Sequence, residues 1–148
     1  MKTTSYPEVK NRDLVGTYPA LVKVGGGYVW DDVLEYRVWC CPEDGSPDIE
    51  EGNDYYYSFD RYEQALEFSE ENPGTESPLA LVLQEEYISE PEPGKYIHMK
   101  EQRITEWPVE FLSRPKRSAH TISDFLSPDA PDKKLEILRG VAEAGKRK

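Results

Sequence analysis

Two adjacent cysteines, Cys40 and Cys41, are the residues of this chain that most invite a chemical role. They stand in VWCCPEDG, where a strand-like run meets a proline and an acidic loop. A structural zinc site needs four nitrogen or sulfur ligands, commonly in C-x2–4-C pairs, and a redox motif needs C-x-x-C. The sequence has neither pattern, and neighbouring side chains of a strand point to opposite faces. We therefore expect no metal ion here.

A nucleophilic cysteine is the remaining chemical alternative. It needs a nearby cation or helix N-terminus that lowers the thiol pKa, but Glu43 and Asp44 follow the pair instead. Cys40 continues an apolar alternation and is expected in the core. Cys41 is the candidate reactive thiol, conceivable in a dyad with His98. Packing at a strand end is the favoured interpretation, so no catalytic residue is predicted.

Three other motifs could carry chemistry. The glycines at 25–27 fit neither a Walker loop nor a dinucleotide loop, because a strand-like run follows them rather than a helix. The acidic loop at 42–54 does not match an EF-hand. Four glutamates between 85 and 92 could include a catalytic carboxylate pair, but surface charges on an edge strand explain them better.

Aromatic side chains give the strongest functional indication. Tyr and Trp favour pockets and interfaces, because they combine a large apolar ring with a polar atom. Packing within the core is the competing explanation. The candidates for ligand binding or an interface are Trp30, Trp39, Tyr55, Tyr56, Tyr57, Tyr96, His98 and Trp107.

The net charge of −11 is concentrated in one block. Residues 43–76 contain twelve acidic residues and one basic residue, so the remainder of the chain is neutral. Direct nucleic-acid binding is not expected, because neutralising phosphates requires Lys and Arg. A basic protein is the more natural partner. The basic cluster SRPKRS at 113–118 could contact an anion, although a solvated loop is the favoured interpretation.

The first half of the chain predicts strands followed by a helix. Residues 13–24 and 28–40 both alternate apolar and polar side chains, and the glycines between them can supply the positive φ of a tight reversal. We expect a β-hairpin there. YYYSF at 55–59 predicts a third strand. The following segment predicts a helix over about 60–71, with Asp60 as N-cap and Glu63 completing a capping box.

The second half predicts another hairpin and a final helix. LALVL at 79–83 leads through a turn at 90–94 to a return strand, in which Ile97 and Met99 face the core while Tyr96 and His98 face outward. A short helical piece follows near 109–114, then an irregular, proline-containing connection. A final helix is expected over about 132–144.

These elements predict a single α+β domain over 1–148. An antiparallel sheet of four to five strands from two hairpins would carry the helices at about 60–71 and 132–144 on one face. The opposite, tyrosine-bearing face would be exposed or paired with a second subunit. The N-terminus to about residue 12 is expected to be flexible. Because the chain shows no export signal and no long apolar run, we expect a cytoplasmic protein without membrane contact.

Two stretches, VGTYPALVKVGGGYVWDDVLEYRVW and SEPEPGKYIHMKEQRITEWPVEFL, resemble small, poorly characterised bacterial proteins, some of which are identified as GNAT-type N-acetyltransferases. The similarity covers roughly residues 14 to 140. This resemblance implies acetyl-CoA, an amine substrate and a mixed α/β fold. The family's [QR]-x-x-G-x-[GA] loop is absent from VKVGGGYVW, so no catalytic or cofactor residue is carried over.

The sequence favours a non-catalytic domain that binds a small ligand or another protein, without a cofactor. A homodimer through the sheet is one expectation, and a small molecule or a basic protein is another. Two alternatives remain open: an acyltransferase-like enzyme that uses acetyl-CoA, and an acidic decoy that mimics nucleic acid to occupy a basic protein.

Overall fold

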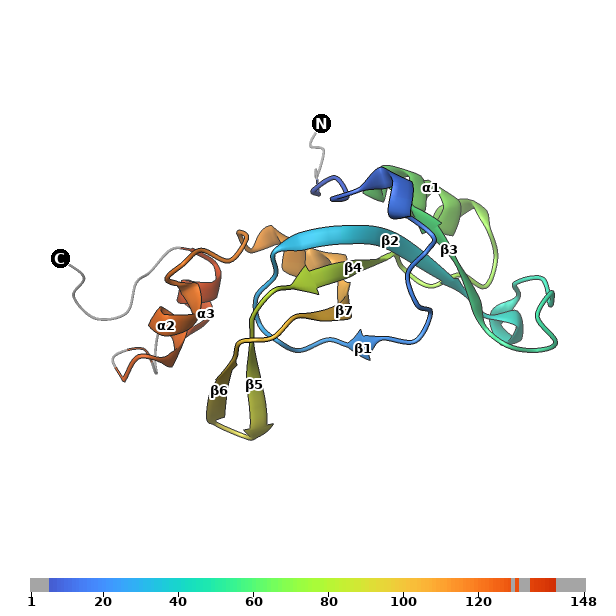
Figure 1. Ribbon diagram of the computed structural model, residues 1–148. Helices are drawn as coiled ribbons and strands as arrows, with labels where there is room; N and C mark the ends of the chain where they lie inside the picture. Colours follow the sequence, from blue (N-terminus) through green and yellow to red (C-terminus); the bar gives the residue numbers. More distant parts are fainter. Residues whose placement is uncertain (1–5, 129, 131–133, 141–148) are drawn as a thin grey trace.

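The computed structural model describes residues 6–128, 130 and 134–140 and shows an α+β fold, as the sequence predicts (Figure 1). Three short 3-10 helices accompany the α-helices: η1 (Arg12–Leu14), η2 (Pro42–Asp44) and η3 (Val109–Ser113). The α-helices are α1 (Tyr62–Glu71), α2 (Thr121–Leu126) and α3 (Lys134–Leu138). The strands are β1 (Lys23–Val24), β2 (Asp32–Cys40), β3 (Tyr55–Phe59), β4 (Leu79–Gln84), β5 (Tyr87–Glu92), β6 (Lys95–Met99) and β7 (Arg103–Pro108).

Five strands form the main sheet in the order β1-β7-β4-β2-β3. β4 pairs antiparallel with β7 on one side and with β2 on the other, and β2 also pairs antiparallel with β3. A register shift between Val33 and Glu35 interrupts the β2–β4 ladder. Such a bulge breaks strict alternation, and Val33 and Tyr36 accordingly both belong to the main apolar cluster.

The predicted hairpin through the three glycines is wrong. β1 does not pair with β2 but runs parallel to β7, with Lys23 opposite Thr105. Residues 13–22 lie outside the sheet, and Leu21 and Val24 are 90% and 81% exposed. The apolar alternation of this segment therefore did not reflect a half-buried strand. β2 instead takes β3 and β4 as partners, which bring more apolar side chains to the core.

The second predicted hairpin divides into two ladders. Its turn lies where expected, but it joins β5 to β6 in a separate two-stranded sheet, while β4 pairs with β7. The predicted facing of β6 is also wrong: the Tyr96 ring packs against Phe125 at 5.0 Å, whereas Ile97 is 49% exposed. The cause is α2, which forms where an irregular connection is expected and which supplies Phe125 next to the hairpin.

The helices occupy two places. α1 packs against β2 and β3, whereas α2 and α3 contact each other, and α2 also contacts β6 (Figure 1). The predicted cap of α1 is not formed, because Arg61 is the N-cap residue and Asp60 pairs with Arg12 at 2.8 Å. α3 ends at Leu138, followed by Gly140 at φ +79°, so the predicted helix stops earlier than 144. The remainder of that prediction, 132–133 and 141–144, lies outside the described residues.

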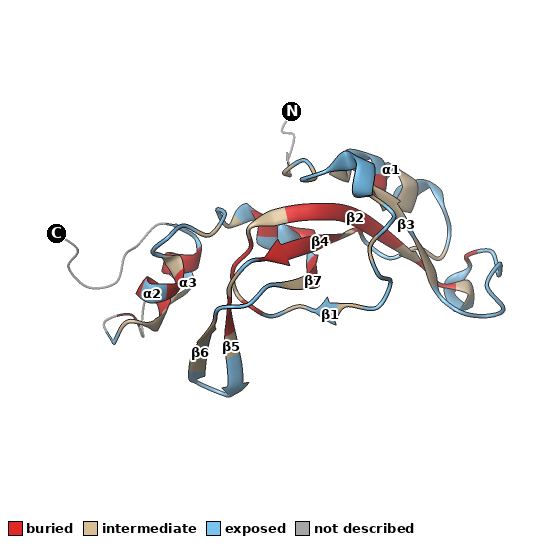
Figure 2. Ribbon diagram, viewed as in Figure 1, coloured by how far each residue is buried: buried red, intermediate tan, exposed pale blue. Residues whose placement is uncertain are grey.

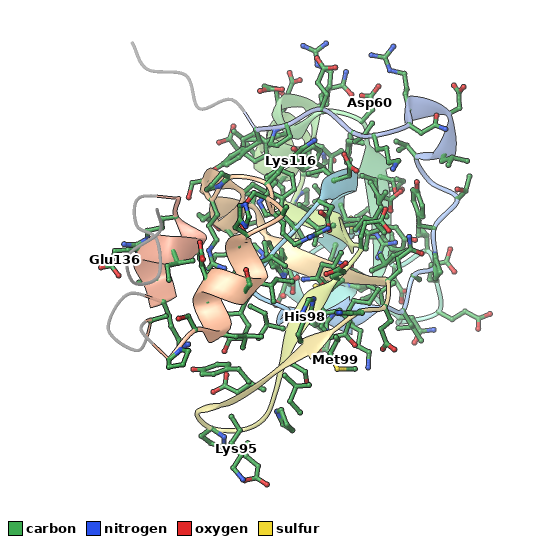
Figure 3. All side chains as sticks on the ribbon, turned by 60° about the vertical axis from the view of Figure 1, so that its left-hand side comes forward. Asp60, Lys95, His98, Met99, Lys116 and Glu136 are labelled. Atoms are coloured by element: carbon green, nitrogen blue, oxygen red, sulfur yellow. The ribbon has the colours of Figure 1, made fainter. Side chains whose placement is uncertain are left out.

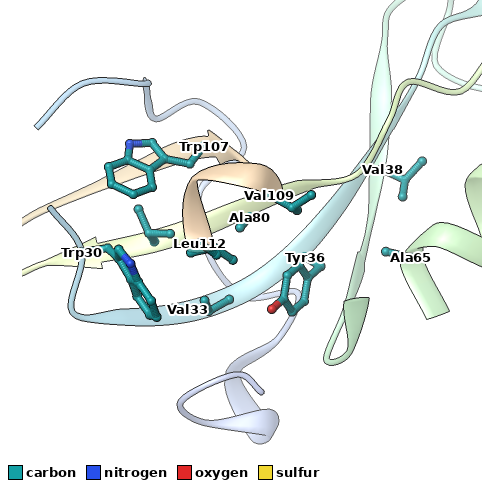
Figure 4. Close-up of a cluster of buried hydrophobic side chains, with 10 residues drawn as sticks. Trp30, Val33, Tyr36, Val38, Ala65, Ala80, Trp107, Val109 and Leu112 are labelled. Atoms are coloured by element: carbon teal, nitrogen blue, oxygen red, sulfur yellow. The ribbon is translucent and has the colours of Figure 1, made fainter. Parts of the chain in front are cut away.

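The main core lies on the side of the sheet that α1 and η3 cover. Burial extends through most of β2 and β4, although Asp32, Trp39 and Leu79 are only half-buried (Figure 2). Figure 4 shows the side chains of this cluster, which are contributed by the three central strands, α1, η3 and Trp30. Residues 6–12, which are expected to be flexible, run beside this core. The Lys10 backbone N–H donates to the Val33 carbonyl at 2.7 Å, and the Tyr6 ring packs on the Tyr62 ring at 4.7 Å. None of the helices in the described residues has the length and apolarity to cross a membrane.

Candidate functional site

The opposite face of the sheet carries a buried ionic network. Arg37 and Glu35 have fully buried side chains, and the Arg37 Nε donates to Glu35 Oε2 at 2.6 Å. Arg37 Nη1 donates to Glu106 Oε2 at 2.8 Å. Burial alone would lower the pKa of Arg37, but the two carboxylates raise it above its usual value. Charges this deeply buried persist only when they are paired and hydrogen-bonded.

The segment at 16–22 covers this network. The Gly16 N–H donates to Glu35 Oε1 at 2.7 Å, and Arg37 Nη1 donates to the Ala20 carbonyl at 3.3 Å. The Arg37 Nη2 donates to the Pro19 carbonyl. The expectation that this face is exposed or paired with another subunit is therefore wrong over the network, because the protein's own N-terminal segment occupies that position.

Two aromatic rings, Trp39 and Tyr56, are held in place beside the network, and the Arg37 guanidinium lies 4.5 Å from the centre of the Tyr56 ring. The Tyr55 ring lies on the other face of β3, 5.9 Å from the ring of Tyr57. The Trp39 indole N–H donates to Glu106 Oε2 at 3.0 Å, and the Trp39 and Tyr56 rings lie 4.8 Å apart. The Tyr56 hydroxyl donates to the Tyr18 carbonyl at 3.3 Å, and the Tyr55 hydroxyl donates to the Pro47 carbonyl at 2.7 Å. Each ring thus has its polar atom bonded to a fixed acceptor, which restricts its orientation.

Trp39 and Tyr56, together with residue Tyr55 and part of the acidic loop, line an open pocket of about 500 Å³. Exposed acidic residues, Glu50 and Asp54, stand at its rim, and Leu21 on the other side is 90% exposed. The complete lining is Ala20, Leu21, Trp39, Glu50, Asn53, Asp54, Tyr55 and Tyr56. Aromatic faces and carboxylates both attract a positive charge. The pocket is therefore suited to an organic cation.

The structure brings three of the eight predicted aromatic or histidine candidates into this pocket. Trp30 and Trp107 are buried in the main core (Figure 4). Tyr57 packs on Phe68 of α1 at 5.1 Å, on the other side of β3. Tyr96 and His98 belong to the β5–β6 hairpin, on which Figure 3 labels His98.

Cys41 and His98 do not form a dyad. Cys41 lies beyond the end of β2, is buried, and has its Sγ 3.7 Å from Glu76 Oε2. Burial, followed by the charge of Glu76, raises its thiol pKa to about 11. His98 Nε2 lies 2.7 Å from Glu86 Oε1. Within the described ranges, no group of three or more His, Cys, Asp or Glu side chains is arranged to hold a metal ion.

The residues that sequence reasoning missed are the buried charges. The alternation of residues 28–40 predicts that Glu35 and Arg37 face away from the core. The signal was available in LEYRVW, where Trp39 continues the same face as the two charges. A large ring on a nominally polar face indicates that the strand is covered on both sides.

Comparison with known proteins gives no relative: no family model, curated protein or solved structure matches this chain.

Proposed function

We propose that this protein binds a basic partner protein by accepting a lysine or arginine side chain in the pocket beside Trp39 and Tyr56. The observation that carries the proposal is the combination of these two oriented rings with Glu50 and Asp54 at the rim of one pocket. Neither feature alone selects a cation strongly. Together they provide ring faces for the charged group and carboxylates for its remaining hydrogens.

The expected energies are moderate. A cation over an aromatic face contributes about 0.5–1 kcal/mol at an exposed site and about 2 kcal/mol once water is excluded. The Trp39 and Tyr56 rings lose little freedom on binding, because their polar atoms are already bonded to Glu106 and to the Tyr18 carbonyl. Such preorganisation lowers the entropic cost of association.

Two further features favour a protein over a free small cation. The acidic block at 43–76 includes the pocket residues Glu50, Asn53 and Asp54. Its negative charge would increase the association rate of a positively charged partner. Leu21 at the rim exposes 90% of its surface. Burying a leucine side chain is worth about 1.5–3 kcal/mol, so a partner with an apolar residue beside its basic one gains from this contact.

The test uses Trp fluorescence during titration with a short peptide of lysine, leucine and serine. Its acetyl-lysine counterpart, which lacks the charge, is the ligand control. The double variant Glu50→Gln/Asp54→Asn is compared with Glu67→Gln/Glu70→Gln. Both remove two charges from the acidic block, but the second pair lies on the exposed face of α1, away from the pocket.

We expect the pocket variant to weaken binding about tenfold and the helix variant to weaken it less than about twofold. Equal losses in the two variants would instead support the acidic decoy, in which only the total charge matters. Equal binding of the acetylated peptide would contradict the proposal, because the pocket would then not discriminate a cation.

A further inference from the structure

A second pocket lies beside the glycine turn and differs in charge from the first. The turn has positive φ at four successive residues, +71°, +84° and +84° at Gly25–Gly27 and +69° at Tyr28. The Val29 N–H donates to the Gly27 carbonyl at 2.8 Å, which closes a three-residue turn around Tyr28. Positive φ is unfavourable for a bulky side chain, and such strain gathers at functional positions.

Side chains from distant strands hold this turn. The Gly25 carbonyl accepts from Thr105 Oγ1 at 3.0 Å. The Gly26 carbonyl accepts from Trp107 Nε1 at 2.9 Å and from Gln84 Nε2 at 3.1 Å. The Tyr28 carbonyl accepts from Arg114 Nη1 at 2.9 Å. In the described part of the chain, the buried side-chain polar atoms without a partner are Gln84 Oε1 and Arg103 Nε, and both side chains also bond to this turn. Strain and unpaired polar atoms therefore coincide at one place in the fold.

The second pocket encloses about 280 Å³ and is lined by Gly26, Tyr28, Trp107, Phe111 and Arg114. The Trp107 and Phe111 rings meet edge to face at 5.6 Å. The Arg114 guanidinium lies 4.8 Å from the centre of the Phe111 ring and 5.8 Å from that of Trp107. The lining thus combines apolar ring surface with one cation and no carboxylate.

Arg114 is half-buried and, like Arg61, Arg103 and Arg139, has no carboxylate partner within the described residues. Arg37 and Arg117 both pair with carboxylates instead. Burial lowers its pKa, and the positive charge of Arg139 lowers it further. Its guanidinium makes one hydrogen bond within the described chain, to the Tyr28 carbonyl. Arg114 also lines the pocket, which places its guanidinium next to a ligand bound there.

We propose that this pocket binds a small aromatic carboxylate, with its ring against Phe111 above the buried Trp107 and its carboxylate on the guanidinium of Arg114. The charge of the ligand follows from an arginine without a carboxylate partner, since an ionic acceptor makes its strongest hydrogen bonds. The size follows from the volume. Pockets for drug-sized ligands have about 300–1,000 Å³, so a pocket of 280 Å³ suits a ligand with a single ring.

The test is a nuclear magnetic resonance titration with benzoate. Benzamide serves as the uncharged ring and inorganic phosphate as the anion without a ring. The reporters are the indole N–H of Trp107, which donates to the turn, and the amide of Gly26. We expect benzoate to shift both signals in a saturable way, while neither control compound does so at the same concentration. Absence of a shift, or an equal shift with benzamide or phosphate, would overturn the proposal.

Three variants locate the interaction. Arg114→Gln is expected to weaken benzoate binding at least about tenfold, because it removes a charge-assisted hydrogen bond. Phe111→Leu leaves the guanidinium in place and is expected to weaken binding about fivefold through loss of the ring contact. Lys116→Gln removes one charge from the same segment without touching the pocket and is expected to change the affinity less than about twofold.

A loss in Lys116→Gln as large as in Arg114→Gln would refute a specific site and indicate general charge attraction. If Arg114→Gln fails to fold, Phe111→Leu decides: benzoate binding unchanged in that variant overturns the proposal. The benzoate titration does not involve the cation pocket, so this inference and the proposed function fail or succeed separately.

Discussion

Replacing Arg37 by methionine tests how much of the stability of this protein depends on the buried ionic network. Arg37→Met leaves Glu35 and Glu106 in a protein interior without their cation, and the Pro19 and Ala20 carbonyls lose a donor. Removing one partner of a buried ion pair costs about 3–5 kcal/mol, because the remaining charge stays desolvated. We expect an unfolding free energy lower by that amount.

The assay is urea denaturation followed by Trp fluorescence and circular dichroism. For a urea dependence of about 2 kcal/mol per molar, the midpoint should fall by about 2 M. The control is the triple variant Arg37→Met/Glu35→Gln/Glu106→Gln. It removes all three charges but keeps an amide oxygen to accept from Gly16 and from Trp39.

We expect this triple variant to be about 2 kcal/mol more stable than Arg37→Met alone, because the cost comes from unpaired charge rather than from lost volume. A loss below about 1 kcal/mol in Arg37→Met would refute the reasoning. A triple variant as unstable as the single one would do so as well, because packing rather than charge would then explain the loss.

Three further predictions test the turn, the thiol and the hairpin. Gly27→Ala should lower the unfolding free energy by about 3 kcal/mol, because the added Cβ would lie 2.2 Å from Gln84 Nε2. Gly16→Ala is the control: its φ is similar but the space around it is open, so it should cost only about 1 kcal/mol in the same urea assay. Because the thiol pKa of Cys41 is raised to about 11, the thiol is protonated at pH 8, and mass spectrometry should show iodoacetamide labelling about a hundredfold slower in the folded protein than in urea. Tyr96→Ser should destabilise the protein by about 3 kcal/mol and Ile97→Ser by less than about 1 kcal/mol; the reverse order would show that the inward-facing Ile97 expected from sequence is correct.

Elements with strong local signals could be predicted from the sequence. The strand at 55–59, the strand at 79–83 and the first helix all appear within a few residues of their expected places. Each has its own pattern of apolar residues and its own ending, such as Pro73 and Gly74 after α1. These signals act over one turn of helix or a few residues of strand.

Strand pairing could not be predicted in the same way. The three glycines permit a reversal, but they do not determine which strand follows alongside, and β1 joins β7 instead of β2. Similarly, the sequence predicts the turn at 90–94, but it does not show that β4 pairs with β7 while β5 pairs with β6. These choices depend on the total burial of the sheet, which the local pattern does not contain.

The site was visible in part. The enrichment of Trp and Tyr indicated a pocket or an interface, but composition cannot separate Trp39, at a pocket, from Trp30 and Trp107, in the core. The difference comes from the face of the sheet on which each ring lies. Trp39 lies on the face of the ionic network, where its N–H donates to Glu106, whereas Trp107 lies on the face of the main core.

The position of β7 has a consequence for how this protein is made. β7 is the last strand in the chain, yet it lies between β4 and β1, and the contact of Lys23 with Thr105 spans most of the sequence. During translation, the apolar face of β2 and β4 is synthesised long before Trp107 and η3 are available to cover it. Such non-local pairing slows folding and prolongs exposure of apolar surface. The nascent chain up to the β5–β6 hairpin is thus the form of this protein most in need of a chaperone.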